Sequence, residues 1–220
     1  WYCVDDGQIY DCFAGGSVRG IVADKLGYKY TGIDIRQEQV DANYENANDL
    51  GLAPVWHCDD SKNVDKYLHD NSMDMIFSCP PYADLEVYSD NPNDISNMDY
   101  EDFCQAYKEI IDIACRKLKD DRFSVFVVGD IRDKKGAYRN FVDYTKKCFL
   151  DNGLITYNEL ILIEQSGTGA IRAKKQFGSL RKVIKTHQNV LVFYKGDIKQ
   201  IKSNYAEIKI DNDMFMDDDA

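Results

Sequence analysis

The segment Asp11-Cys12-Phe13-Ala14-Gly15-Gly16-Ser17 joins a short apolar run, which begins at Gln8, to an amphipathic segment at residues 18–26. Its small residues, 14–17, permit a tight strand-to-helix turn, and the helix that follows offers free backbone N–H groups at its N-terminus. About twenty residues later a second apolar run ends in Thr31-Gly32-Ile33-Asp34-Ile35, whose acid is able to accept both hydroxyls of a ribose. Each feature alone is also typical of an ordinary turn, but their order predicts a nucleoside site.

Short apolar runs alternate with amphipathic stretches along the rest of the chain, which is typical of a mostly parallel sheet with crossover helices. We therefore expect an α/β fold with helices on both faces of the sheet. Gly27 and Gly51 follow two expected helices, at the position that favours a left-handed cap. The last two strands have no expected helix between them and should be antiparallel. The expected strands are residues 8–13, 28–35, 54–58, 73–78, 123–128, 155–163 and 189–194, and the expected helices are 18–26, 37–50, 100–118 and 138–152.

The composition favours one folded domain. The chain has 220 residues, of which 44% are hydrophobic and 12% aromatic, and this excludes a disordered class. It has no apolar run of about 18 residues, so no membrane-spanning helix is expected. Seven cysteines without a C-x-x-C pair or a signal peptide indicate reduced, cytoplasmic thiols, and three distant histidines suggest no metal site. Because the chain begins at Trp1, we expect it to be an excised piece that lacks an N-terminal segment.

Charge is spread unevenly. The net charge of −11 argues against a general nucleic-acid binder. Residues 166–188, however, contain no acid and six basic residues, in one of two long connections in the chain. We expect residues 1–202 to form the domain, with a basic loop inserted at 164–188, and residues 203–220 to form an acidic tail. The basic residues, which either bind a polyanion or form a solvated loop, are Arg172, Lys174, Lys175, Arg181, Lys182 and Lys185.

Two further strand ends carry candidate site residues. The third strand ends in Cys58-Asp59-Asp60-Ser61, where Asp60 is placed either to hold the amino group of an adenine or to cap a helix. The fourth strand ends in Cys79-Pro80-Pro81-Tyr82. Its prolines remove two N–H donors and stiffen the turn, which leaves carbonyl oxygens to accept from an exocyclic amine while Tyr82 stacks on a planar ring. The alternative is a rigid turn that only closes the strand.

These segments resemble a known family, the S-adenosylmethionine-dependent amino-methyltransferases that act on DNA. Phe13-Ala14-Gly15-Gly16-Ser17 resembles the F-x-G-x-G cofactor loop of that family, and Cys79-Pro80-Pro81-Tyr82 resembles its D/N/S-P-P-Y/F/W catalytic loop. Residues 187–196, His-Gln-Asn-Val-Leu-Val-Phe-Tyr-Lys-Gly, are similar to its H-E-x-x-L-V-F-x-K-G strand. Two positions depart from the pattern, because Ser17 replaces a Gly and Cys79 replaces an Asp, Asn or Ser. A thiol is a weak acceptor, so the second departure bears on the target atom.

The resemblance implies a Rossmann-like methyltransferase with seven strands, the last one antiparallel, that uses S-adenosylmethionine to methylate an exocyclic amine of cytosine or adenine in DNA. It implies a cofactor site at Asp11, Phe13, Ala14, Gly15, Gly16, Ser17, Asp34, Ile35 and Asp60, and a catalytic loop at Cys79, Pro80, Pro81 and Tyr82. The six basic residues of the insertion are the expected DNA contacts, and a further recognition segment or partner is expected to supply the sequence specificity.

Three alternatives stay open. Cys79 as a thiolate would add to carbon 6 of cytosine and activate carbon 5 for methylation. The second alternative is methylation of RNA or of a protein amide, since related Pro-Pro-Tyr loops serve those substrates. A chain that binds the cofactor without activity is the third alternative.

Overall fold

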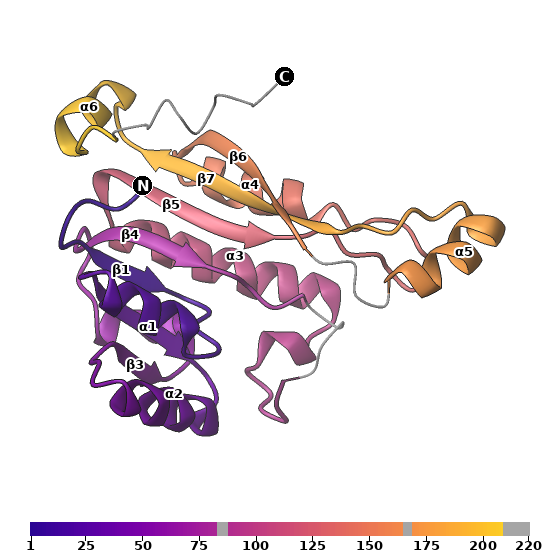
Figure 1. Cartoon of the computed structure of the whole chain (residues 1–220), viewed down its shortest axis with the longest axis horizontal. Coiled ribbons are helices and arrows are strands. Elements are labelled where there is room, and N and C mark those ends of the chain that lie inside the picture. The colour runs from indigo at the N-terminus through magenta and orange to yellow at the C-terminus, as the bar shows by residue number, and fades with distance from the viewer. Residues whose placement is uncertain (83–87, 165–168, 209–220) are drawn as a thin grey trace, which may run out of the picture.

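In the described part of the chain, residues 1–82, 88–164 and 169–208, a computed structural model shows seven strands in one sheet, in the order β3-β2-β1-β4-β5-β7-β6 (Figure 1). The strands are β1 (Gln8–Asp11), β2 (Lys29–Asp34), β3 (Val55–Cys58), β4 (Met73–Ser78), β5 (Leu118–Val128), β6 (Ile155–Ile163) and β7 (His187–Lys195). Strands β1 to β5 pair in parallel, whereas β7 runs antiparallel to both β5 and β6. This confirms the predicted fold class.

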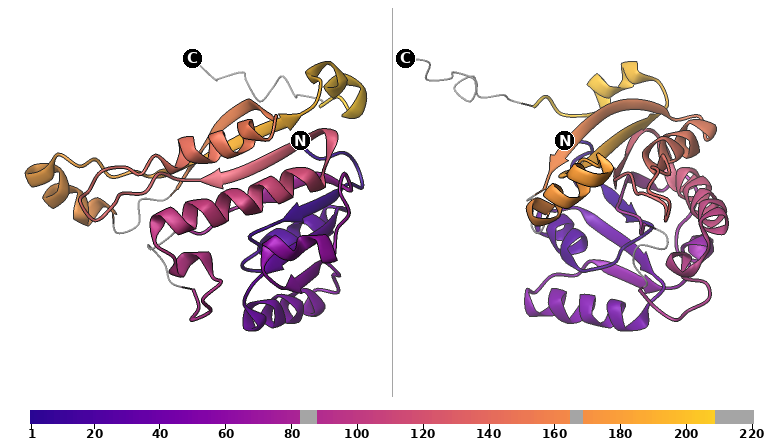
Figure 2. Two further views of the ribbon diagram at one scale, coloured as in Figure 1. Left: turned by 180° about the vertical axis from the view of Figure 1, so that it is seen from behind. Right: turned by 90° about the vertical axis from the view of Figure 1, so that its right-hand side faces the viewer.

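Helices cover both faces of the sheet, as Figure 2 shows from two sides, and others lie beyond the ends of its strands. The helices are α1 (Val18–Lys25), α2 (Gln37–Asp49), α3 (Tyr100–Lys117), α4 (Phe141–Asp151), α5 (Gly169–Leu180) and the short α6 (Ile201–Asn204), with 3-10 turns η1 (Ser61–Lys66), η3 (Ile95–Asn97) and η4 (Ile198–Gln200). None of the helices within the described ranges is long and apolar enough to cross a membrane.

Helix ends follow the local sequence. Gly27 and Gly51 have φ values of +86° and +65° after α1 and α2, which confirms the predicted left-handed caps. Helix α3 begins at a capping side chain, since Asp99 accepts from the backbone N–H groups of Glu101 and Asp102 at 3.0 Å each. These caps fix the ends of α1 and α2 and the start of α3, and therefore where the adjoining turns meet the sheet.

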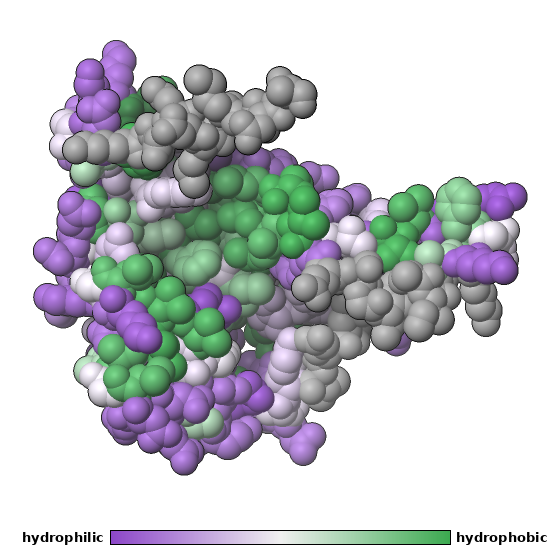
Figure 3. Space-filling view, in the orientation of Figure 1, coloured by the Kyte–Doolittle hydropathy of each residue, from purple (hydrophilic) through white to green (hydrophobic). Residues whose placement is uncertain are grey.

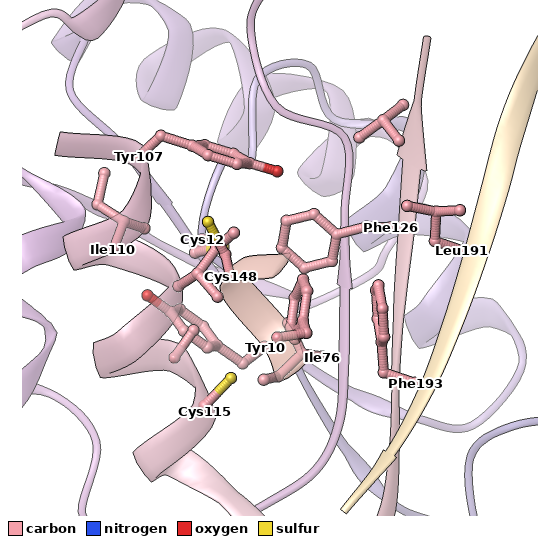
Figure 4. Close-up of a cluster of buried hydrophobic side chains, with 14 of the residues drawn as sticks. Tyr10, Cys12, Ile76, Tyr107, Ile110, Cys115, Phe126, Cys148, Leu191 and Phe193 are labelled. Carbon is pink, nitrogen blue, oxygen red and sulfur yellow. The ribbon is translucent and has the colours of Figure 1, made fainter. Parts of the chain in front are cut away.

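Successive side chains of the central strands are buried on opposite faces of the sheet, because side chains alternate along a strand. Ile9, Met75 and Val125 belong to the core beneath α1 and α2. Their neighbours in sequence pack against α3 and α4 on the other face, where aromatic rings and cysteine side chains fill the interior (Figure 4). The labelled residues of this second layer are Tyr10, Cys12, Ile76, Tyr107, Ile110, Cys115, Phe126, Cys148, Leu191 and Phe193.

The basic insertion differs from the expectation of a loop, because residues 169–180 form α5. The segment is rich in Ala, Lys, Arg and Gln, which have high helix propensity, and its apolar residues Ala170, Ala173, Phe177 and Leu180 recur at helical spacing. Figures 1 and 2 show α5 at the end of an arm that continues from β6 and β7 beyond the body of the sheet. The last two strands are antiparallel as predicted, but a helix separates them.

An apolar groove of about 530 Å³ lies on the α1 face of the sheet. Figure 3 shows hydrophobic side chains gathered over this side of the molecule. Val18 of α1 and Leu26, the residue after α1, are 70% and 68% exposed there, and Trp1 and Leu160 also line the groove. The groove is separate from the carboxyl ends of the parallel strands, where the predicted site residues lie.

Candidate functional site

The carboxyl ends of β1, β2, β3 and β4 open into a cavity of about 400 Å³. Strand order reverses between β1 and β4, and ligands of open α/β sheets bind at such a switch point. Ten of the thirteen predicted cofactor and catalytic residues line this cavity: Phe13, Gly15, Gly16, Asp34, Ile35, Asp60, Cys79, Pro80, Pro81 and Tyr82. The structure thus brings together residues that are far apart in the sequence.

The glycine turn forms one wall. Gly15 has a φ of +50°, and a Cβ at either Gly15 or Gly16 would meet no atom within 4 Å. The turn is held by side chains from below, since Gly15 N donates to Asp34 Oδ2 at 2.9 Å and Asn43 Nδ2 donates to the Gly15 carbonyl at 2.7 Å. The glycines therefore leave open space above a fixed backbone.

Asp34, at the end of β2, faces this space. Its Oδ1 accepts from the backbone N–H of Arg36 at 2.9 Å, and the Arg36 guanidinium lies 3.6 Å from the same oxygen. Burial raises the pKa of Asp34 despite these contacts. An acid held at the end of the second strand, beside the glycine turn, is suited to accept from hydroxyl groups of a ligand.

Asp60 shows one of its two expected roles, the helix cap, and it also lies in the cavity wall. Its Oδ1 accepts from Lys62 N at 2.9 Å to cap η1. The neighbouring Asp59 also reaches the cavity, but hydrogen bonds from Lys66, Asn63 and Tyr67 outweigh its burial and lower its pKa.

Three predicted residues are not in the cavity wall: Asp11, Ala14 and Ser17. Asp11 is fully buried beneath the turn, where its carboxylate accepts from Ser78 Oγ at 2.6 Å and Tyr30 Oη at 2.8 Å. Arg19 completes this cluster with an ion pair to Asp11 of 2.6 Å. Direct contact between Asp11 and a ligand was expected, but its oxygens are occupied by the protein.

The turn after β4 forms the opposite wall. Pro80 is buried, Cys79 is half-buried, and both line the cavity with Pro81 and Tyr82. The Tyr82 hydroxyl donates to Gln188 Oε1 at 3.0 Å, and its ring meets the edge of Phe141 with a centroid distance of 6.1 Å. Burial raises the pKa of the Tyr82 phenol well above its ordinary value.

The predicted nucleic-acid contacts are outside the cavity, on the arm. Lys174 and Arg181 are exposed, and the Lys182 amine occupies the space that a Cβ of Gly136 would need. Lys185 Nζ lies 3.3 Å from Asn189 Oδ1. The side chains of Arg172 and Lys175 lie outside the described part of the chain, as do residues 84 and 86, which are candidates for base contacts.

Sequence reasoning missed several cavity residues. Arg19 and Gln39 reach it from α1 and α2, and their helical positions carry no signal of this. Asn93, Asp94 and Ile95 line it from the segment before α3, and the charge of Asp94 adds to the effect of burial in raising the pKa of Asp34. Asp94 is buried and caps η3 by accepting from Ser96 N at 2.9 Å, and such a cap was the one detectable signal.

Comparison with known families identifies one match. Residues 73–216, more than half of the chain, match the model of a family described as DNA methylase, N6_N4_Mtase. The match begins at β4 and includes the Cys79–Tyr82 turn and the arm. A search of the curated proteins found no match.

Solved structures share the fold at low sequence identity. TrmN from Thermus thermophilus superposes with a TM-score of 0.60 at 14% identity, covering 87% of this chain, and the chain spans 44% of the length of TrmN. A SAM-dependent methyltransferase from Methanosarcina mazei gives 0.58 at 16% identity, covering 88% of this chain and 94% of that protein. An rRNA methylase from Streptococcus thermophilus gives 0.54 at 13% identity, covering 89% and 91%.

Proposed function

This chain belongs to the DNA methylase family whose model it matches over residues 73–216, and from this membership we propose that it transfers a methyl group to an exocyclic amine of cytosine or adenine in DNA. The cofactor is S-adenosylmethionine, which supplies an electrophilic methyl group. The single observation that carries the proposal is that the glycine turn after β1 and the Pro-Pro-Tyr turn after β4 face one cavity.

The cavity residues fit a nucleoside cofactor. The space above Gly15 and Gly16 is open, so a ligand is able to approach the backbone to contact distance. A side chain at either position would fill that space. Asp34 would accept from the ribose hydroxyls, and Asp60 would accept from the adenine amine. Phe13 and Ile35 would contribute apolar contacts beside these polar groups.

The turn after β4 would orient the target amine. Pro80 and Pro81 lack N–H groups, so their peptide units offer only carbonyl acceptors to the cavity. An amine hydrogen directed at a carbonyl or at the Cys79 sulfur frees the nitrogen lone pair for attack. The Tyr82 ring would stack on the base, and much of the rate would come from this orientation.

The arm would hold the nucleic acid beside the cavity. A second basic segment lies beside the insertion, since Lys182 packs next to Gly136 in the connection between β5 and α4. That connection carries Arg132, Lys134 and Lys135. Flipping a base out of a duplex costs a few kcal/mol, which phosphate contacts of these cations would offset.

The decisive experiment is nucleoside mass spectrometry of DNA incubated with the chain and isotope-labelled cofactor. Labelled N4-methylcytosine or N6-methyladenine is expected, and 5-methylcytosine would instead indicate covalent catalysis by Cys79. RNA is the second candidate substrate, since an rRNA methylase shares the fold, and it is included in the same assay. Tight cofactor binding without any transfer to DNA, RNA or protein would contradict the proposal and favour an inactive cofactor-binding module.

Three broader assignments belong to the same proposal. The catalytic domain, predicted as residues 1–202, would extend to residue 205, because α6 runs to Asn204 and the Tyr205 ring packs against Phe123, and the acidic tail predicted as residues 203–220 would begin after it. All seven cysteines are free, and with a nucleic-acid substrate this favours a cytoplasmic location. A further segment or partner would supply sequence recognition.

A further inference from the structure

A chain of side-chain hydrogen bonds leads from the cavity wall to the base of the arm. The Tyr82 hydroxyl donates to Gln188 Oε1 at 3.0 Å, and Gln188 Nε2 donates to the Glu164 carboxylate. Glu164 in turn donates its backbone N–H to the Thr186 carbonyl at 2.9 Å. Neither Gln188 nor Glu164 lines the cavity, so neither is expected to touch a ligand there.

The two residues lie where the arm begins. Glu164 directly follows β6, and Gln188 is opposite Leu162 in the β6–β7 register. The same two strands lead to α5 and its basic residues (Figure 1). The hydrogen bonds therefore connect the wall that would stack on a base with the element that would hold the nucleic acid.

The chemistry of the three groups fixes the direction of each bond. An ionised carboxylate only accepts, so Glu164 turns the amide nitrogen of Gln188 toward itself and the amide oxygen toward Tyr82. Because an amide oxygen only accepts, the Tyr82 hydroxyl is the donor in this bond. An amide is suited to this position because it accepts on one side and donates on the other.

The ring of Tyr82 is also confined by packing. Its edge-on contact with Phe141 has an interplanar angle of 77°, and a Cβ at Gly129 would lie 3.5 Å from the Tyr82 hydroxyl. Rotation about the ring's own axis keeps the hydroxyl in place, whereas a change of rotamer would break the bond to Gln188. The amide thus selects one position of a ring that still lines the cavity.

We propose that Gln188 is a positioning residue that, held by Glu164, sets the Tyr82 ring for the target base. This inference rests on the proposed function, because it assumes that Tyr82 stacks on a base that receives the methyl group. Positioning acts after binding. Loss of Gln188 should therefore slow methyl transfer at saturating DNA and leave the affinities for DNA and for S-adenosylmethionine unchanged.

The test measures single-turnover methyl transfer to DNA by the whole chain. Gln188→Met and Tyr82→Phe are each expected to lower the rate at saturating DNA by about three- to tenfold, the range of one lost hydrogen bond, and their combination is expected to lower it no further. Dissociation constants for DNA and cofactor should stay within twofold. Additive losses would mean that the two side chains act independently and would overturn the proposal.

A charge exchange provides a rescue. Gln188→Glu places two carboxylates side by side and should slow transfer. When Glu164→Gln is added, the new carboxylate at 188 accepts from the Tyr82 hydroxyl, and the new amide at 164 donates to that carboxylate. The double variant should recover most of the wild-type rate. The matched control is Glu159→Gln on the same strand, whose partners are Asn189 and Lys146, and this variant should keep the wild-type rate.

The outcomes separate the two proposals. If the wild type is active but Gln188→Met has the same rate, or if the Gln188→Glu/Glu164→Gln variant does not recover the rate, only the role of Gln188 is contradicted. A wild type that transfers no methyl group contradicts the proposed function and this inference with it. Equal loss of folding stability in Glu159→Gln and Gln188→Met, with no difference in rate, would show that the pair is structural only.

Discussion

Arg19 reaches back from the first turn of α1 to Asp11 at the end of β1, with Nε 2.6 Å from Oδ2. Its Nη2 also donates to the carbonyls of Phe13 and Ala14, at 2.6 and 2.8 Å. One guanidinium therefore neutralises a buried carboxylate and binds two carbonyls of the glycine turn. The planar fork of an arginine suits this set of acceptors, and the pKa of Arg19 is raised further because the Asp11 charge and hydrogen bond outweigh the effect of burial.

Replacement of Arg19 should weaken cofactor binding through the turn. Arg19→Met leaves Asp11 as an uncompensated buried charge, which costs about 3–5 kcal/mol of unfolding free energy, and it releases the two carbonyls. We expect at least a tenfold loss of S-adenosylmethionine affinity by titration calorimetry. Arg19→Lys should retain most of the stability but not the affinity, and Lys25→Met at the other end of α1 should change neither. Wild-type affinity in a folded Arg19→Met chain would contradict the role of this pair.

Gly32 gives a second test of the turn, because it packs directly beneath it. A Cβ at Gly32 would lie 2.8 Å from Ala14 Cβ and 2.9 Å from Trp56 Cδ1. Gly32→Ala should therefore displace the turn and lower the unfolding free energy by about 1–3 kcal/mol. In Gly16→Ala the new methyl group meets no protein atom, so stability should hold while cofactor affinity falls. Urea denaturation and calorimetry measure the two effects, and equal stability losses would argue against this packing account.

The arm should determine the salt dependence of DNA binding. Each phosphate contact contributes about 0.9 to the slope of log K against log salt concentration, so Lys174→Ala/Arg181→Ala/Lys182→Ala should reduce the slope by about 2–3. Cofactor affinity should not change, because none of the three lines the cavity. The matched control removes the same number of charges elsewhere, as Lys29→Ala/Lys199→Ala/Lys202→Ala. An equal reduction in both variants would assign the effect to net charge and not to the arm.

The sheet was predictable because its signals are local. Each expected strand overlaps an observed one, since a short β-rich run bounded by turn residues indicates a strand from its own residues alone. Gly27 and Gly51 mark helix ends for the same reason, because a positive φ there favours glycine. The placement of Asp34 and Asp60 at the cavity follows from the same order, because the carboxyl ends of neighbouring parallel strands lie at one edge of the sheet.

Long-range side-chain contacts were not predictable from the pattern. Nothing near Gln188 in sequence indicates that its amide meets Tyr82, more than a hundred positions away. Arg19 looks like any polar residue at the start of a helix. Asp11 was misplaced for the same reason, since an acid at a strand end is equally able to face a ligand or, as here, to accept from Ser78, Tyr30 and Arg19.

Asp74 should make stability depend on acid pH. Its side chain is 8% exposed and accepts from Lys119 Nζ at 2.8 Å and Gln8 N at 3.1 Å, with Arg122 Nε 3.2 Å away. Burial alone would raise the pKa of Asp74, but these donors outweigh it and lower the pKa. The stabilisation is therefore present above the unfolded-state pKa of about 3.9 and lost as pH falls through the lower folded value.

The variant for this test is Asp74→Asn. Its unfolding free energy should lie about 2 kcal/mol below wild type at pH 7, and the gap should close as pH falls below about 4, measured by urea denaturation. Asp120→Asn, at a carboxylate that is 79% exposed, is the control and should follow the wild type throughout. A gap that stays constant down to pH 2 would show that the charge of Asp74 is not what stabilises the fold.

Cys79 lines the cavity at the position where the catalytic loop that it resembles carries an Asp, Asn or Ser, so its replacement tests which bond the chain forms. In amine methylation the side chain only accepts a hydrogen bond, and a hydroxyl accepts better than a thiol, so Cys79→Ser should keep or increase the rate. In carbon methylation the sulfur must add to carbon 6, and the same variant should lose all activity. Nucleoside mass spectrometry separates the products, and Cys104→Ser on α3, outside the cavity wall, controls for the loss of a thiol. Loss of amine methylation in Cys79→Ser alone would require a role for the sulfur that hydrogen bonding does not supply.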